Sequence, residues 1–62
     1  MTFNQLKSKA KAGFASAHYP KTVINGNEIM AVAHRRGRSF AVNFYINNER
    51  VSAEEAKATL ES

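Results

Sequence analysis

Three tight-turn signals divide residues 22–51 into short segments with β-strand character. Asn25-Gly26 is the strongest of them, because both residue types accept a positive φ angle and together favour a two-residue hairpin loop. Arg36-Gly37 and Asn47-Asn48 supply two further reversals of the chain. The segments between the turns are β-branched or show period-two spacing, so the sequence predicts antiparallel strands at residues 22–24, 28–34 and 39–46.

A short return segment and a helix follow the third predicted strand. Residues 49–51 turn back after Asn47-Asn48 and bring Val51 near Phe44. Ser52 and Glu55 then have the spacing of a capping box, in which the serine oxygen accepts the Glu55 amide proton and the glutamate reaches back to the serine amide. The sequence therefore predicts a helix over residues 53–61.

Another helix is predicted before the strands, over residues 2–17. Thr2 is a suitable N-cap, and an apolar stripe at helical spacing follows it: Phe3, Leu6, Ala10 and Phe14. Pro20 ends the segment, because the residue before a proline is pushed out of the α region.

This order of elements predicts an α+β fold, in which an N-terminal helix, a three-stranded antiparallel meander and a short C-terminal helix follow one another (α-β-β-β-α). The 62 residues suffice for a single small basic domain, residues 1–62. A chain of this length buries only about 60% of the surface that its unfolded form exposes. No cysteine is present to form a disulfide, so homodimerisation is an open route to further stability.

The turn at Arg36-Gly37 allows two registers between the second and third strands. A three-residue loop with a G1 bulge at Gly37 would collect the large side chains on one face: Met30, Val32, Phe40, Val42, Phe44 and Ile46. The opposite face would then hold Ile29, Ala31, Ala33, Ala41, Asn43 and Tyr45. A two-residue loop would instead set Ala31 and Ala33 beside the large residues of the third strand. We favour the bulged register because it gathers the bulk on one side.

The run His34-Arg35-Arg36-Gly37-Arg38 makes a positively charged hairpin tip. Arginine stays protonated at physiological pH, and its planar fork fits phosphate or carboxylate oxygens. The whole chain carries a formal net charge of +4. Residues 1–38 hold seven of the nine basic side chains and one of the five acidic ones. The sequence therefore indicates an anionic partner, although small domains also carry net charge for solubility alone.

The sequence contains no pattern of residues that is typical of a catalytic site or of a cofactor-binding site. All five acidic residues are glutamates, and none is spaced with His18 or His34 as a metal site or catalytic triad would require. Gly26 and Gly37 are turn glycines rather than parts of a phosphate-binding loop. We therefore expect a protein that is not an enzyme and that holds no metal or cofactor.

Nucleic acid, with DNA favoured, is the partner that the pattern predicts best. A two-stranded ribbon fits the major groove of B-DNA, and its basic tip can follow the phosphates. Asn43 and Tyr45 could read bases from the flatter, alanine-rich face of the sheet, or that face could pack against the N-terminal helix. The candidate binding residues are Arg35, Arg36, Arg38, His34, Lys21, Asn43, Tyr45, Lys7 and Lys11.

Three antiparallel strands followed by a helix that begins Ser52-Ala53-Glu54-Glu55-Ala56 resemble two groups of DNA-binding modules. These are the arm-binding domains of tyrosine integrases and the plant ethylene-response DNA-binding domains. The resemblance covers about residues 22–61, and it implies DNA binding through the exposed face of the sheet. The characteristic tryptophans of those modules are absent here, and the N-terminal helix is additional.

A protein-interaction module or inhibitor is the alternative. The arginine-rich hairpin could dock on an acidic protein surface, and the edge at residues 22–24 could add a strand to a partner. No stretch approaches the roughly 20 apolar residues that span a bilayer, and the N-terminus lacks the apolar core of a secretory signal. We expect a cytoplasmic protein without a membrane partner, of a type common among phage and mobile-element accessory proteins.

Overall fold

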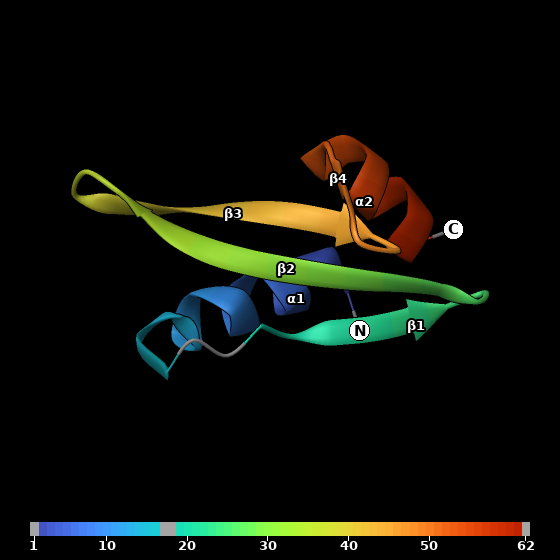
Figure 1. Ribbon diagram of the computed structural model, residues 1–62, viewed down its shortest axis with the longest axis horizontal. Helices are drawn as coiled ribbons and strands as arrows, with labels where there is room; N and C mark the ends of the chain where they lie inside the picture. The colour runs from blue at the N-terminus through green and yellow to red at the C-terminus, as the bar shows by residue number, and fades with distance from the viewer. Residues whose placement is uncertain (1, 17–18, 62) are drawn as a thin grey trace.

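The computed structural model describes residues 2–16 and 19–61. The chain runs, within those residues, through α1 (Phe3–Ala12), the short 3-10 helix η1 (Phe14–Ser16), β1 (Lys21–Ile24), β2 (Asn27–Arg36), β3 (Ser39–Ile46), β4 (Glu49–Val51) and α2 (Ala53–Leu60) (Figure 1). The predicted α+β class is confirmed. The sheet has a fourth strand that the prediction did not count, because the return segment at residues 49–51 pairs with β3.

The four strands form an antiparallel meander in the order β1-β2-β3-β4. Asn25 and Gly26 have φ angles of 51° and 79°, and Asn47 and Asn48 have φ angles of 52° and 69°. Positive φ at both central residues is the signature of a type I′ turn, whose twist matches that of the flanking strands. The return segment brings Val51 opposite Phe44, as the sequence predicted.

The turn between β2 and β3 has the two-residue form, so the favoured bulged register is wrong. Arg36 pairs with Ser39, and Gly37 takes a φ of 61° at the first central position of the loop. That is the position where a type II′ turn requires glycine, whereas the three-residue loop with a G1 bulge needs glycine at its third position. Ala31 consequently lies opposite Phe44, and Ala33 lies opposite Val42.

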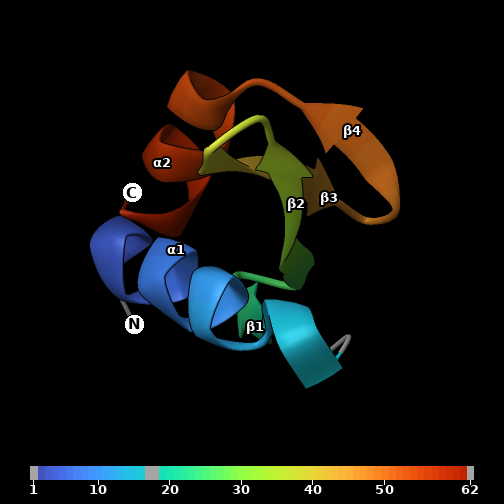
Figure 2. The same ribbon diagram turned by 90° about the vertical axis from the view of Figure 1, so that its left-hand side faces the viewer.

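The corrected register moves the small side chains of β2 to the face that the helices cover. Both helices lie on the same face of the sheet (Figure 2). Alanines on β2 let α1 approach the strand closely. The large buried side chains are Ile29 at the start of β2 and Leu6, Phe44 and Leu60 of the other elements. The buried core consists of Leu6, Ala10, Ile29, Ala31, Ala33, Phe44, Ala56 and Leu60.

Two aromatic contacts mark the centre and the margin of this core. Phe44 is 2% exposed and stacks on Phe3, with 4.9 Å between the ring centroids. Phe40, which the sequence predicts on the same face as Phe44, does share that face but remains 44% exposed. It meets Phe14 edge to face at 4.9 Å, so both rings lie at the margin of the core.

The predicted helix caps are present. Thr2 Oγ1 accepts from the Gln5 amide and Gln5 Oε1 accepts from the Thr2 amide, which is a complete capping box for α1. Ser52 Oγ accepts from the Glu55 amide at 3.1 Å and caps α2, which is one half of the predicted capping box. The return bond from the Ser52 amide to the Glu55 side chain does not form among the described residues. The helix predicted over residues 2–17 is shorter than expected, because α1 ends at Ala12 with Gly13 as its C-cap. Residue 17 lies outside the described residues.

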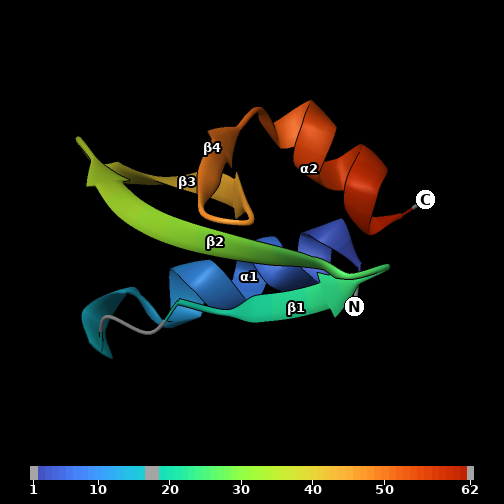
Figure 3. The ribbon, with the colours of Figure 1, turned by 45° about the vertical axis from the view of Figure 1, so that its right-hand side comes forward.

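The β2–β3 hairpin projects beyond the remaining elements (Figure 1). β1 pairs with β2 only as far as Met30, and β4 pairs with β3 only from Phe44 onward. Residues 31–43 therefore form a two-stranded ribbon, and β2 is the long bent strand that carries it (Figure 3). The molecule measures 34 × 20 × 19 Å, and its basic hairpin tip lies at one end.

Candidate nucleic-acid interface

The face of the sheet opposite the helices is uncovered in the described part of the chain (Figure 2). We call it the open face. Because side chains alternate across a strand, the register assigns residues to it directly. They are Lys21 and Val23 of β1, Glu28, Met30, Val32, His34 and Arg36 of β2, Ser39, Ala41, Asn43 and Tyr45 of β3, and Arg50 of β4.

One cross-sheet row spans the open face at its wide end. Lys21 pairs with Met30, Met30 with Tyr45, and Tyr45 with Arg50. Three inter-strand gaps separate the outer two positions by about 14 Å. The row thus has a cation on each edge strand and two half-buried apolar or aromatic side chains between them.

The two edge cations have different partners. Lys21 Nζ lies 3.7 Å from Glu28 Oε1, and both side chains are about half exposed. Arg50 Nη2 donates to Asn43 Oδ1 at 3.3 Å. A carboxylate partly neutralises Lys21, whereas a neutral amide leaves the full charge of Arg50 in place. Positive charge on the open face is therefore strongest on the β4 side and toward the hairpin tip.

The three arginines of the hairpin do not share one face. Arg36 continues the open-face series of His34, while Arg35 pairs with Phe40 on the covered side of the ribbon. Arg35 Nε donates to the Gly37 carbonyl oxygen at 3.3 Å, which holds its side chain along the turn. Arg38 occupies the second central position of the loop. The positive charge that the sequence predicts at the hairpin tip is therefore divided between the two faces of the ribbon and the loop itself.

Asn43 and Tyr45 lie on the open face, so the alternative in which their face packs against the N-terminal helix is wrong for these residues. Both side chains are half-buried by their neighbours on the sheet. Asn43 is paired with Val32 and Tyr45 with Met30, because the two-residue loop turned the alanines of β2 to the covered side. The face is more apolar than the alanine-rich surface that the sequence predicted.

His34 lies on the open face opposite Ala41 and is half-buried. Its Nδ1 atom is enclosed by protein atoms and has no hydrogen-bond partner among the described residues. The imidazole is thus packed into the surface of the ribbon and presents only part of its ring to a ligand.

Lys7 and Lys11 are exposed on α1, on the helix-covered side of the sheet. They do not join Lys21, Asn43 and Tyr45 on one surface. The basic and acidic halves of the sequence also do not form separate lobes, because β2 pairs with β3 from Ile29 to Arg36.

Arg50 is the residue of this surface that sequence reasoning missed. A tight turn at Asn47-Asn48 places Glu49 opposite Ile46 and Arg50 opposite Tyr45. The turn was predicted and Tyr45 was a candidate, so counting two residues past the turn would have found Arg50.

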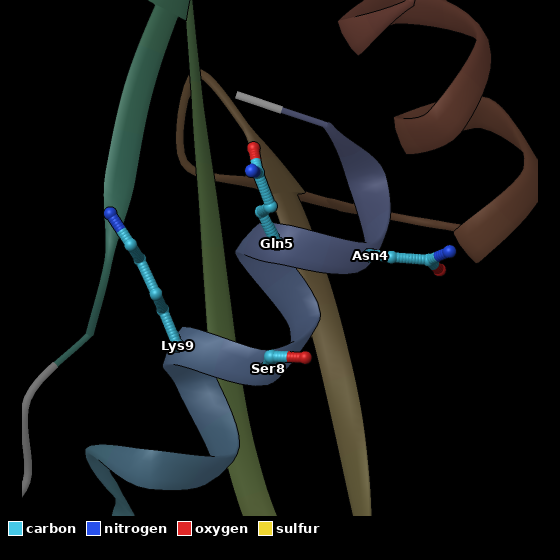
Figure 4. A pocket seen from close by; sticks show the side chains of 4 residues that line it. All are labelled: Asn4, Gln5, Ser8 and Lys9. Atoms are coloured by element: carbon cyan, nitrogen blue, oxygen red, sulfur yellow. The ribbon is translucent and has the colours of Figure 1, made fainter.

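The rest of the surface offers little for chemistry. A shallow hollow of about 530 Å³ is lined by Asn4, Gln5, Ser8 and Lys9, all from α1 (Figure 4). These side chains fan out from one helix and do not converge on a common point. Within residues 2–16 and 19–61, no group of three or more histidine, aspartate or glutamate side chains could hold a metal ion. The described helices are all too short or too polar to cross a membrane.

Comparison of the chain with models of known protein families, with curated proteins and with solved structures finds no match.

Proposed function

We propose that this protein is a non-enzymatic DNA-binding protein of the cytoplasm that lays its β2–β3 ribbon in the major groove of a duplex. The open face is turned toward the bases in this arrangement. The major groove of B-DNA is about 12 Å wide and admits a two-stranded ribbon. Residues 31–43 form such a ribbon. Its base packs on α1 through Ala31 and Ala33, and its tip extends beyond the helices (Figure 1).

The uncovered, positively charged face of the sheet is the observation that carries this proposal. Three cations, Lys21, Arg36 and Arg50, share that face with the single carboxylate of Glu28. Polar and aromatic side chains, Asn43 and Tyr45, lie between them. A surface that reads a duplex combines these two elements, because phosphate contacts give affinity and register while contacts to base edges give specificity.

The phosphate contacts divide between the two ends of the ribbon. Arg36 and Arg38 at the tip contact phosphates at one end of the site. Lys21 lies on an edge strand at the wide end of the sheet. The sheet is broader than the groove there, so Lys21 meets the sugar-phosphate backbone of the DNA at the edge of the groove. About three neutralised phosphates give a slope near −3 in a plot of log affinity against log salt, at ~0.9 per phosphate.

A salt titration of duplex binding tests this function. The wild-type protein is titrated into a fluorescent duplex and into each of its single strands, from low salt to about physiological salt. Duplex binding that weakens with a slope near −3 supports the proposal. If the protein binds neither the duplex nor the single strands at low salt, the proposal is contradicted.

A protein-interaction role is the second candidate, and the exposed edge of β1 favours it. β1 is one of the two edge strands of the sheet, and Val23 on it is 64% exposed. An edge strand of this kind can accept an added strand from a partner. The salt titration distinguishes DNA binding from protein binding. If the protein binds neither duplex nor single-stranded DNA, an acidic protein surface is the remaining partner for its arginines.

A further inference from the structure

We infer that Asn43 and Arg50 act together as the base-reading pair of the open face and select guanine edges in the major groove. This inference rests on the proposed function. It deepens that function from DNA binding in general to the chemistry of the bases that are preferred.

The pair joins two strands across the open face. Arg50 lies on β4 opposite Tyr45, and Asn43 lies two residues before Tyr45 on the same face of β3. The 3.3 Å bond from Arg50 Nη2 to Asn43 Oδ1 draws the guanidinium away from the rim of the sheet. The side chain therefore extends toward the two-stranded ribbon, which is the part that enters the groove.

The hydrogen bond decides what each side chain can offer a ligand. A guanidinium has five N–H donors and no acceptor, so one bond to Asn43 leaves four donors and restricts the plane of the group. Asn43 uses its oxygen toward Arg50 and keeps its two amide N–H donors. The pair thus presents donors almost exclusively.

A donor-only surface suits guanine better than any other base. Guanine shows two acceptors, N7 and O6, at its major-groove edge, whereas adenine shows one acceptor and one donor. Asparagine reads adenine by accepting from N6 and donating to N7. One of the two lone pairs of Asn43 Oδ1 already accepts from Arg50, so the adjacent guanidinium restricts the approach of N6 to this oxygen. Two neighbouring guanines on one strand offer enough acceptors for both side chains.

The β1 edge of the sheet is not suited to reading guanine. Lys21 carries a point charge without a planar fork, and it is paired with the carboxylate of Glu28 at 3.7 Å. Glu28 is an acceptor-only group that repels the acceptor edge of guanine. The reading function is therefore on the β3–β4 side, and Lys21 is left for the phosphate backbone.

Selection from a pool of duplexes with a randomised centre tests the inference. We expect the wild-type protein to enrich sites with adjacent guanines on one strand. Replacing those guanines by 7-deazaguanine, which lacks the N7 acceptor, should weaken binding on the order of 10-fold, the worth of a good bidentate contact. Inosine in the same positions changes only the minor groove and should have little effect.

Three variants complete the test. Arg50→Ala removes the guanidinium, and Asn43→Ala removes the partner that orients Arg50; both should lose the guanine preference and the response to 7-deazaguanine. Arg35→Ala is the matched control, because it removes the same charge from the covered side and should keep both. If Arg50→Ala enriches the same sites as the wild type, or if 7-deazaguanine has no effect, the reading pair is refuted while DNA binding stands. A wild-type protein that retains no duplex refutes the proposed function and the reading pair together.

Discussion

Ala31 lies directly opposite Phe44 across the β2–β3 ladder, on the face that both helices cover. Ala31 is fully buried, and the phenylalanine ring is 2% exposed and stacked on Phe3. The small side chain on β2 leaves space for the large one on β3 and for the approach of α1. This pairing exists because the loop at Gly37 has two residues.

Ala31→Leu tests this register. The leucine would have to enter a packed core, and overpacking of this kind typically costs about 1–3 kcal/mol. We expect a clear fall in the free energy of unfolding measured with urea. Ala41→Leu is the matched control, because Ala41 lies on the open face, where added bulk meets solvent. Equal stability of the two variants would instead favour the bulged register, in which both alanines share the other face.

Phe44→Ala should cost about 3–5 kcal/mol, which is enough to unfold a domain of this size. The loss comes from the buried ring itself and from its stacking on Phe3. Phe40→Ala provides the comparison, because that ring is 44% exposed and should contribute much less. Thermal melting followed by circular dichroism measures both, and a Phe44→Ala variant with an unchanged melting curve would remove Phe44 from the core.

Ser52→Ala should destabilise the protein by about 0.5–2 kcal/mol, because Ser52 Oγ accepts the Glu55 amide at the start of α2. Amide hydrogen exchange at Glu54 and Glu55 reports on this cap directly, and we expect faster exchange in the variant. Ser8→Ala is the control, because Ser8 is an exposed residue in the middle of α1, and it should leave stability nearly unchanged. Equal protection at Glu54 and Glu55 in the wild type and in Ser52→Ala would show that Ser52 does not cap the helix.

Glu28→Gln should strengthen DNA binding severalfold. The carboxylate of Glu28 lies 3.7 Å from Lys21 Nζ, so it weakens the attraction of Lys21 for phosphate and itself repels the backbone. Folding stability should change little, because exposed ion pairs contribute about 0–1 kcal/mol. Glu54→Gln on α2 removes the same charge from the covered side and controls for net charge. Identical gains in duplex affinity for the two variants would mean that Glu28 acts only through the total charge of the chain.

Sequence patterns predicted the elements of this fold well because their signals are local. The caps at Thr2 and Ser52 and the turns at Asn25-Gly26 and Asn47-Asn48 each depend on residues within one turn of the chain. The strand register did not follow from such a signal. It depends on whether glycine is the first or the third residue of the loop, and the rule of gathering bulk on one face chose wrongly. That rule ignored the helix, which needs small residues on the strand that it approaches.

The sequence predicted only part of the candidate site, because it shows where the charges lie along the chain but not on which face of the sheet they lie. The sequence predicts Asn43 and Tyr45 on one face of the sheet, and the register places them so. Lys21 was a candidate by charge alone, and its pairing with Met30 puts it on the same face. Lys7 and Lys11 were grouped with them by charge alone, although α1 lies on the other side of the sheet. Charge counts along a sequence do not distinguish the two faces of a ribbon, and only the register does.

The most direct test of the account compares two triple variants that remove the same charge from opposite faces. One replaces Lys21, Arg36 and Arg38 by alanine, and the other replaces Lys7, Lys11 and Arg35. All six side chains are exposed, so both variants should fold, which circular dichroism confirms before binding is measured.

The measurement is the slope of log affinity against log salt for one duplex. If the open face and the hairpin tip bind the phosphates, the first variant should lose about 2–3 from the slope, at ~0.9 per contact, and the second should lose less than about 1. Equal losses in the two variants, or a larger loss in the second, would contradict the claim that the open face of the sheet binds DNA.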